Sequence, residues 1–131
     1  MFYPYGPNQD QKRLIPYLVY SLKNGIPIQL ADTSSIHDWI TTRDISSAIS
    51  WIITNEVPIE IDIGTSFGFT NLELLLTLEK LLQIKNQSSV KGEHVTGLNE
   101  VFVADKNSPL FTSGWAPKDT LTSGLQWVLR S

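Results

Sequence analysis

The chain has 131 residues, a length that predicts a single domain over residues 1–131. Its 13 acidic and 10 basic side chains give a net charge of −3 without a basic block, so we do not expect nucleic acid as a partner. The sequence has no cysteine, which excludes disulfides and thiolate metal sites and fits a cytoplasmic location. It also has no apolar run of the roughly 18 residues that a membrane span needs, so no membrane contact is expected.

The first half of the chain predicts helices that alternate with short extended segments. In order, these are a helix from Leu14 to the Asn24-Gly25 pair, a short strand over residues 27–31, an apolar stretch over residues 36–40, and a helix after Thr41. The first helix has leucines four residues apart, and glycine is the favoured residue just past a helix. The second has apolar residues at 45, 48, 49, 52 and 53, which predict one buried face.

Residues 58–82 combine a predicted strand, a glycine loop and a predicted helix. Isoleucines at 59, 61 and 63 alternate with acidic residues, the period-2 pattern of a strand with one buried face. Gly64 and Gly68 interrupt this pattern, and the spacing of Thr70 and Glu73 predicts a capping box at the start of a leucine-rich helix. α/β proteins bind ligands at such places, because loop amides and a helix N-terminus converge there.

The last part of the chain predicts short elements and one longer helix. Two strands are expected over residues 93–98 and 100–104, followed by a helical turn within residues 105–111 and a bend at residues 114–117. A last helix begins after Asp119 or Thr120, either of which can cap it. Helices thus alternate with short strands, which predicts an α/β fold, or α+β if the strands form separate small sheets.

Gly64-x-Ser66-x-Gly68 matches the nucleophile-elbow pattern, so a small serine hydrolase that uses Ser66 is one alternative function. Such an enzyme needs an acid and then a histidine later in the chain. The only acids between Ser66 and His94 are glutamates, two of which belong to the leucine-rich helix. The capping box also begins that helix four residues too late for an elbow. A glycine turn with an incidental serine is the simpler interpretation.

Other chemical motifs are scarce. The sequence has no dinucleotide-binding fingerprint and no phosphate-binding loop, and its two histidines, His37 and His94, lack the spacing of a metal pair, so no metal site is expected. His37 could donate a hydrogen bond to a phosphate, although a histidine at a strand end is more often a plain surface or core residue. Arg13 precedes a predicted helix and could bind a phosphate too; solvated charge is the alternative.

Six segments, in order and spacing, resemble one family. These are residues 2–7 (FYPYGP), 13–16 (RLIP), 24–28 (NGIPI), 37–49 (HDWITTRDISSAI), 62–74 (DIG followed by TNLEL) and 104–125 (ADK, GWAP and GL). Each is weak alone, but together they resemble the carboxy-terminal portion of an NAD-dependent epimerase/dehydratase, an extended short-chain dehydrogenase/reductase that acts on nucleotide-sugars. The resemblance covers nearly the whole chain.

The resemblance implies that this chain is a fragment of a longer enzyme. The family's N-terminal Rossmann domain carries G-x-x-G-x-x-G and Tyr-x-x-x-Lys, and neither motif occurs here. The implied role is to bind a nucleoside-diphosphate sugar for chemistry done by that missing domain, in a parent that is an epimerase, dehydratase or 4-keto reductase. The parent would use NAD or NADP, whereas the fragment alone would bind no cofactor and catalyse nothing. A homodimer stays open, and so does a non-catalytic binding or interaction module of the same fold.

The resemblance also assigns residues. Tyr5, Gly6 and Pro7 would bind the cofactor near the nicotinamide, and the substrate would contact Arg13, Leu14, Gln29, His37 and Thr70. The chain departs from the family's pattern in places. His37 replaces an arginine that binds the diphosphate, and Asp62 replaces a common asparagine, so the grip on an anion is expected to be weaker or pH-sensitive.

Overall fold

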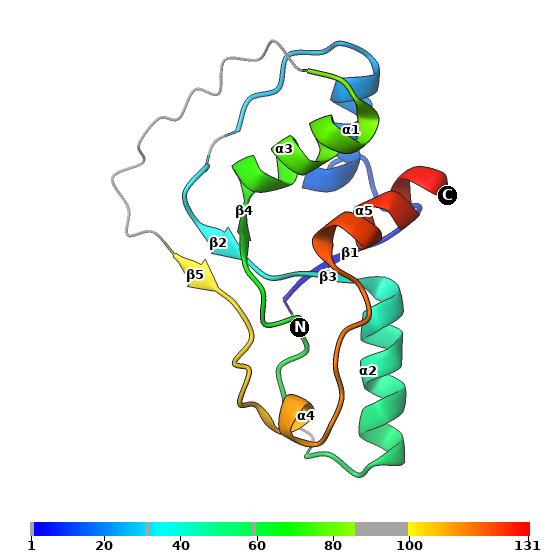
Figure 1. The fold of residues 1–131 in the computed structure, drawn as a ribbon, viewed down its shortest axis with the longest axis vertical. Helices are drawn as coiled ribbons and strands as arrows, with labels where there is room; N and C mark the ends of the chain where they lie inside the picture. Colours follow the sequence, from blue (N-terminus) through cyan, green and yellow to red (C-terminus); the bar gives the residue numbers. More distant parts are fainter. Residues whose placement is uncertain (1, 31, 59, 86–99) are drawn as a thin grey trace.

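The structure is a computed structural model that describes residues 2–30, 32–58, 60–85 and 100–131 (Figure 1). Its elements are β1 (Tyr3–Tyr5), α1 (Leu14–Lys23), β2 (Ile36–His37), β3 (Trp39–Thr41), α2 (Thr42–Thr54), β4 (Phe69–Thr70), α3 (Asn71–Leu82), β5 (Val101–Phe102), α4 (Pro109–Thr112) and α5 (Leu121–Arg130). Helices alternate with short strands, which confirms the α/β class. None of the described helices is long and apolar enough to cross a membrane.

The strands form two small sheets. β1 pairs in parallel with β3, with Tyr3 opposite Trp39. In the second sheet β2 lies in the centre, antiparallel to β4 and parallel to β5. The apolar stretch over residues 36–40 therefore contributes to one strand of each sheet, and Asp38 is the residue between these two strands.

Two apolar clusters form the core. The larger one joins α1, α3 and α5, which lie near one another in Figure 1, and its fully buried leucines are Leu18, Leu74, Leu78 and Leu125. The smaller one lies beside α2 and α4 and contains Ile40, Ile45, Ala48, Leu110 and Trp115. The helices contribute residues at helical spacing, because those residues line one face of each helix, and strands and loops add Tyr5, Ile40 and Trp115.

The predicted helices are confirmed at their starts. Thr70 and Glu73 form both halves of a capping box, and the hydroxyl of Thr41 accepts a hydrogen bond from the amide of Asp44. Thr120, rather than Asp119, caps α5. One part of the pattern for α2 is wrong: Ile49 and Ile53 are 43% and 73% exposed, because the second cluster packs against the side of α2 that carries Ile45, Ala48 and Ile52.

Two predicted strands are not formed by the described residues. Residues 27–30 are not a strand, although Ile28 and Leu30 are buried and Gln29 is exposed as alternation requires. Residues 60–63 are not a strand either, and their link to β1 is one hydrogen bond of 3.2 Å from the amide of Phe2 to the carbonyl oxygen of Ile63. A strand needs a hydrogen-bonded neighbour, which an alternating pattern cannot reveal.

The elements near the C-terminus are shorter than predicted. The strand expected over residues 100–104 contracts to β5, and the helical turn expected within residues 105–111 is α4. The strand expected over residues 93–98 lies outside the described residues.

Candidate functional site

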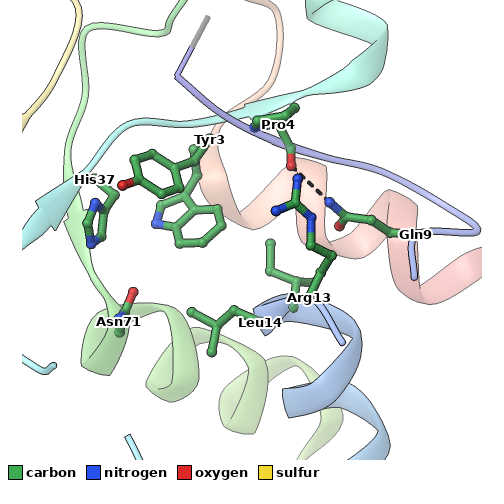
Figure 2. Close-up of a pocket in the computed structure, with 9 residues that line it drawn as sticks. Tyr3, Pro4, Gln9, Arg13, Leu14, His37 and Asn71 are labelled. Atoms are coloured by element: carbon green, nitrogen blue, oxygen red, sulfur yellow. Dashed lines mark hydrogen bonds between the residues drawn. The ribbon is translucent and has the colours of Figure 1, made fainter. Parts of the chain in front are cut away.

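A cleft of about 260 Å³ opens between β1, the start of α1, the ends of β2 and β3, and the start of α3 (Figure 2). Its lining residues are Tyr3, Pro4, Gln9, Arg13, Leu14, Ile15, His37, Trp39 and Asn71. They come from four separate parts of the sequence, which the fold brings to one place.

Local structure explains why these side chains meet. The parallel register of β1 and β3 sets Tyr3 beside Trp39. Side chains alternate along an extended chain, so His37 lies on the same side as Trp39, while Asp38 between them points into the interior. Asn71 is the first residue of α3, next to the capping Thr70, and Arg13 is the N-cap residue of α1.

Aromatic rings form one wall of the cleft. The ring centroid of His37 lies 4.4 Å from that of Tyr3 and 6.2 Å from that of Trp39, and the centroids of Tyr3 and Trp39 are 5.3 Å apart. On another side, His37 is parallel to Phe102 at 6.0 Å. These neighbours leave His37 only 9% exposed, so its imidazole is fixed at the inner end of the cleft.

Three polar atoms of this lining are buried without a hydrogen-bond partner among the described residues. They are Nδ1 of His37, Nε1 of Trp39 and Oδ1 of Asn71. The orientation of the Asn71 amide is set by its nitrogen, which donates to the carbonyl oxygen of Asp32 at 2.9 Å, so the oxygen is left as a free acceptor. An unpaired buried polar atom costs about 1–3 kcal/mol, so the cleft is suited to a ligand that pairs with these atoms.

The charges of the cleft are few and uneven. Burial lowers the pKa of His37 from its ordinary value of 6.5, and the carboxylates of Asp32 and Glu100 only partly oppose this shift. The imidazole is therefore neutral at pH 7. Arg13 is the cation among the lining residues and is exposed; Figure 2 shows its guanidinium on the far side of the cleft from His37, near Gln9.

Asp38 supports the cleft from behind. Its carboxylate is fully buried and accepts hydrogen bonds from the amide and hydroxyl of Thr65 at 2.8 and 2.6 Å, and from the amides of Ser66 and Ala104 at 2.9 and 3.1 Å. One side chain thus ties the 64–66 loop and the segment after β5 to the residue between His37 and Trp39.

Ser66 lacks the surroundings of a nucleophile in the described part of the chain. Its hydroxyl donates to the carbonyl oxygen of Ala104 at 2.9 Å, and its φ of 70° belongs to a loop whose two amides face Asp38. A serine nucleophile needs its hydroxyl bonded to a base. His94, the later histidine of the hydrolase alternative, lies outside the described residues.

Of the residues assigned to the substrate from the sequence, Arg13, Leu14 and His37 line this cleft. Thr70 is not in its lining and caps α3, and Gln29 is exposed elsewhere. These two assignments stay predictions.

The residues assigned to the cofactor, Tyr5, Gly6 and Pro7, do not line the cleft either. Tyr5 is 1% exposed and packs in the core against α5, and a Cβ at Gly6 would overlap the side chain of Thr42. Their assignment also stays a prediction.

Sequence reasoning missed Trp39 and Asn71. Trp39 could have been predicted, because side chains two residues apart on an extended segment lie on the same side and His37 was already a candidate. Its position in the lining shows that this tryptophan is not simply a core residue. The sequence offered less indication of Asn71 as a site residue, since its one distinguishing feature is that it follows the helix-capping Thr70. No cluster of histidines and carboxylates within the described residues could hold a metal ion.

Known proteins resemble this chain along almost its whole length. It is 30% identical over 142 residues to a dTDP-glucose 4,6-dehydratase of Neisseria gonorrhoeae, covering 95% of this chain and 41% of the relative. It is 27% identical over 133 residues to a CDP-abequose synthase of Salmonella typhimurium, covering 96% of this chain and 44% of the relative. No protein-family model matches the chain.

Comparison with solved structures finds the same kinds of enzyme. A dTDP-glucose 4,6-dehydratase from Bacillus anthracis, in complex with NAD, superposes with a TM-score of 0.77 at 26% identity, covering 98% of this chain and 41% of that one. In sequence and in fold, the chain resembles part of the extended short-chain dehydrogenase/reductases.

The chain corresponds to the carboxy-terminal portion of these relatives, as the sequence resemblance predicts. A UDP-glucose 4-epimerase from Thermotoga maritima, with UDP-glucose, has the same fold, with a TM-score of 0.78 at 22% identity over 98% of this chain and 43% of that one. The chain spans less than half the length of the relatives it matches.

Proposed function

We propose that this chain is the substrate-binding part of an NAD(P)-dependent nucleotide-sugar epimerase, dehydratase or reductase. Its cleft would hold part of a nucleoside-diphosphate sugar, while the chemistry takes place on an N-terminal Rossmann domain of the same parent. The relatives named above support the class, since their names include dehydration of a dTDP-sugar and epimerisation of a UDP-sugar.

The observation that carries the proposal is the set of three buried polar atoms without partners in one cleft, with Arg13 at its edge. Small-molecule sites combine apolar walls with a few converging polar groups, and this lining has that composition. The volume of about 260 Å³ is slightly below the roughly 300–1,000 Å³ of typical ligand sites. The cleft would therefore hold one portion of the ligand, and the rest would extend toward the remainder of the parent.

The parent would use NAD or NADP, which supplies and receives the hydride in enzymes of this family. Tyr5, Gly6 and Pro7 are the residues that the resemblance assigns to this cofactor. Because the Tyr5 ring is buried and the space around Gly6 is filled by Thr42, these residues could offer the cofactor little beyond backbone atoms. The chain would not bind the cofactor by itself.

Titration of the chain with UDP-, CDP-, dTDP- and GDP-glucose, followed by backbone amide shifts, tests the proposal. One of them should move the signals of Arg13, Leu14 and His37, and Arg13→Ala should weaken that ligand about tenfold, since a hydrogen bond to a charged group is worth about 1.5–3 kcal/mol.

Arg130→Ala is the matched control, because it removes another exposed arginine that is not in the lining and should leave affinity unchanged. Failure of all four ligands, in this chain and in its full-length parent, would disprove the proposal.

A further inference from the structure

We propose that the inner end of the cleft recognises a neutral group that both donates and accepts hydrogen bonds, and that the phosphates of the ligand stay at the Arg13 edge. Such a group is a sugar hydroxyl or the imide edge of a pyrimidine. This inference rests on the proposed function only for naming the ligand as a nucleotide-sugar. It also gives His37 a different task from the phosphate-binding arginine that the family resemblance places there.

The unpartnered atoms have fixed hydrogen-bonding roles. Indole Nε1 of Trp39 can only donate, and Oδ1 of Asn71 can only accept, because the amide nitrogen of Asn71 is already bonded to Asp32. A phosphate oxygen could accept from Trp39 but could offer nothing to Asn71 unless protonated. A hydroxyl or an imide satisfies both atoms, since it carries a donor beside an acceptor.

The electrostatics of the inner end also disfavour an anion. His37 is neutral there because burial lowers its pKa, and the charged side chains that act on it, Asp32 and Glu100, are both acidic. The phenol of Tyr3 and the indole of Trp39 complete this end without adding charge. Moving a phosphate there would leave most of its charge unpaired in a buried setting, which is strongly unfavourable.

The aromatic wall suits a flat or apolar face. Tyr3 and Trp39 lie at an interplanar angle of 49°, and His37 meets Trp39 edge-on at 80°. Bases stack on such rings for about 1–3 kcal/mol each, and the C–H face of a sugar can pack on them in the same way. The Arg13 guanidinium, across the cleft, is then left for the phosphates (Figure 2).

The test follows the indole N–H signal of Trp39 in ¹⁵N-labelled protein, assigned by its loss in Trp39→Phe. The probes are UDP-glucose, UDP, glucose 1-phosphate, uridine, methyl glucoside and pyrophosphate. We expect uridine or methyl glucoside, both uncharged, to shift this signal, and whichever succeeds identifies base or sugar as the occupant. Pyrophosphate should leave the signal in place at pH 8 while shifting the Arg13 amide.

Two variants sharpen the result. Trp39→Phe keeps a ring and removes an N–H that has no hydrogen-bond partner among the described residues, so it should weaken the successful uncharged probe at least fivefold and leave pyrophosphate unchanged. Trp51→Phe is the matched control, because its indole N–H donates to Ser113 away from the cleft and the change should not affect binding. His37→Arg should strengthen pyrophosphate and weaken the uncharged probe.

The outcomes separate the two proposals. Binding of uncharged probes at Trp39 without binding of any nucleoside-diphosphate sugar would remove the proposed function and keep this inference. The inference is overturned if pyrophosphate shifts the Trp39 signal, if no uncharged probe shifts it at tens of millimolar, or if His37→Arg tightens UDP-glucose tenfold. The last result would mean that the diphosphate of UDP-glucose lies within reach of residue 37, at the inner end.

Discussion

At the scale of single residues, the stretch from His37 to Trp39 organises the candidate site. The side chains of His37 and Trp39 face the cleft. Asp38 lies between them, and its side chain points the opposite way, where it joins two segments of the chain. Its carboxylate accepts from Thr65, Ser66 and Ala104 and so joins the 64–66 loop to the segment after β5. The adjacent histidine and tryptophan thereby gain fixed positions, which a binding site requires.

Replacing the Asp38 carboxylate by an amide should destabilise the fold. In Asp38→Asn, one acceptor oxygen becomes an NH₂ that faces N–H donors, so buried amides lose their partner. We expect a loss of about 3 kcal/mol, measured by urea unfolding, because each unsatisfied buried group costs about 1–3 kcal/mol. Asp62→Asn changes an exposed aspartate three residues before Thr65 and should alter stability by less than about 0.5 kcal/mol. Equal effects of the two changes would contradict this role.

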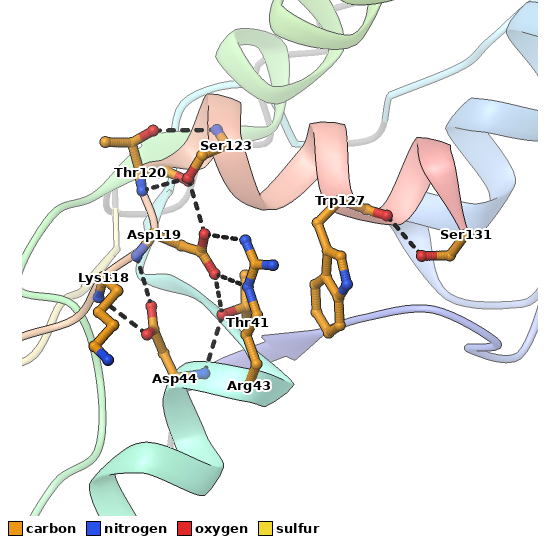
Figure 3. Close-up of polar contacts among 9 residues, drawn as sticks. All are labelled: Thr41, Arg43, Asp44, Lys118, Asp119, Thr120, Ser123, Trp127 and Ser131. Carbon is orange, nitrogen blue, oxygen red and sulfur yellow. Dashed lines mark hydrogen bonds and ion pairs between the residues drawn. The ribbon is translucent and has the colours of Figure 1, made fainter.

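At the scale of elements, α2 and α5 are joined by a polar network (Figure 3). Arg43 forms a two-point ion pair with Asp119, whose carboxylate also accepts from the hydroxyls of Thr41 and Ser123 at 2.8 and 2.9 Å. Asp44 accepts from the amides of Lys118 and Asp119, each at 3.0 Å. Thr41 and Asp44 have the spacing of a capping box, but only Thr41 caps, because the side chain of Asp44 binds the segment that precedes α5.

At Gly124, α5 lies directly against Tyr5 and Thr41. A Cβ there would lie 2.7 Å from Cγ2 of Thr41 and 2.9 Å from Cζ of Tyr5, and closer still to the Tyr5 hydroxyl. Tyr5 is fully buried and has no room to yield. The Gly-Leu pair of the family resemblance thus reflects a packing requirement.

Gly124→Ala should therefore lower stability, although alanine favours a helix by about 1 kcal/mol over glycine. Overpacking costs about 1–3 kcal/mol and here should exceed that gain, so we expect a net loss of about 1–2 kcal/mol in thermal or urea unfolding. Thr122→Ala, an exposed change on the same helix, is the control and should be neutral or slightly stabilising. A Gly124→Ala protein as stable as the original would show that α5 can move away at little cost.

At the scale of the whole molecule, the stability of the fold is linked to pH through His37. Its pKa is lower in the folded chain than in the unfolded chain, because burial disfavours the charged ring. The unfolded chain therefore binds more protons below its pKa of about 6.5, so the contribution of His37 is present above that pH and is lost as the pH falls.

Unfolding by urea at pH 8, 7, 6 and 5 checks this linkage. The free energy of unfolding of the protein minus that of His37→Gln should change little between pH 8 and pH 7 and should fall as the pH drops to 6 and then to 5. The subtraction cancels the titration of His94, which both proteins share. A difference that grows toward acid pH would mean that the charged imidazole finds a partner in the fold, and the neutral inner end of the cleft would then be wrong as well.

The sequence by itself determined the helices, their caps and the family resemblance. Helical spacing of apolar residues and the Thr70–Glu73 box are local signals, and they carry over because the interactions behind them span three or four residues. The same locality explains why Arg13, Leu14 and His37 could be nominated as site residues. They stand in short motifs whose order along the chain is itself a family signature.

Only the tertiary structure decided which residues share the cleft and which extended segments become strands. Tyr3, Trp39 and Asn71 meet through strand register and through the start of α3, which are contacts between distant parts of the chain. Residues 27–30 and 60–63 alternate like strands but are not strands, because the hydrogen-bonded neighbour that makes a strand is a long-range partner. The neutrality of His37 is decided in the same way, since its burial by Tyr3, Trp39 and Phe102 exists only once these segments have come together.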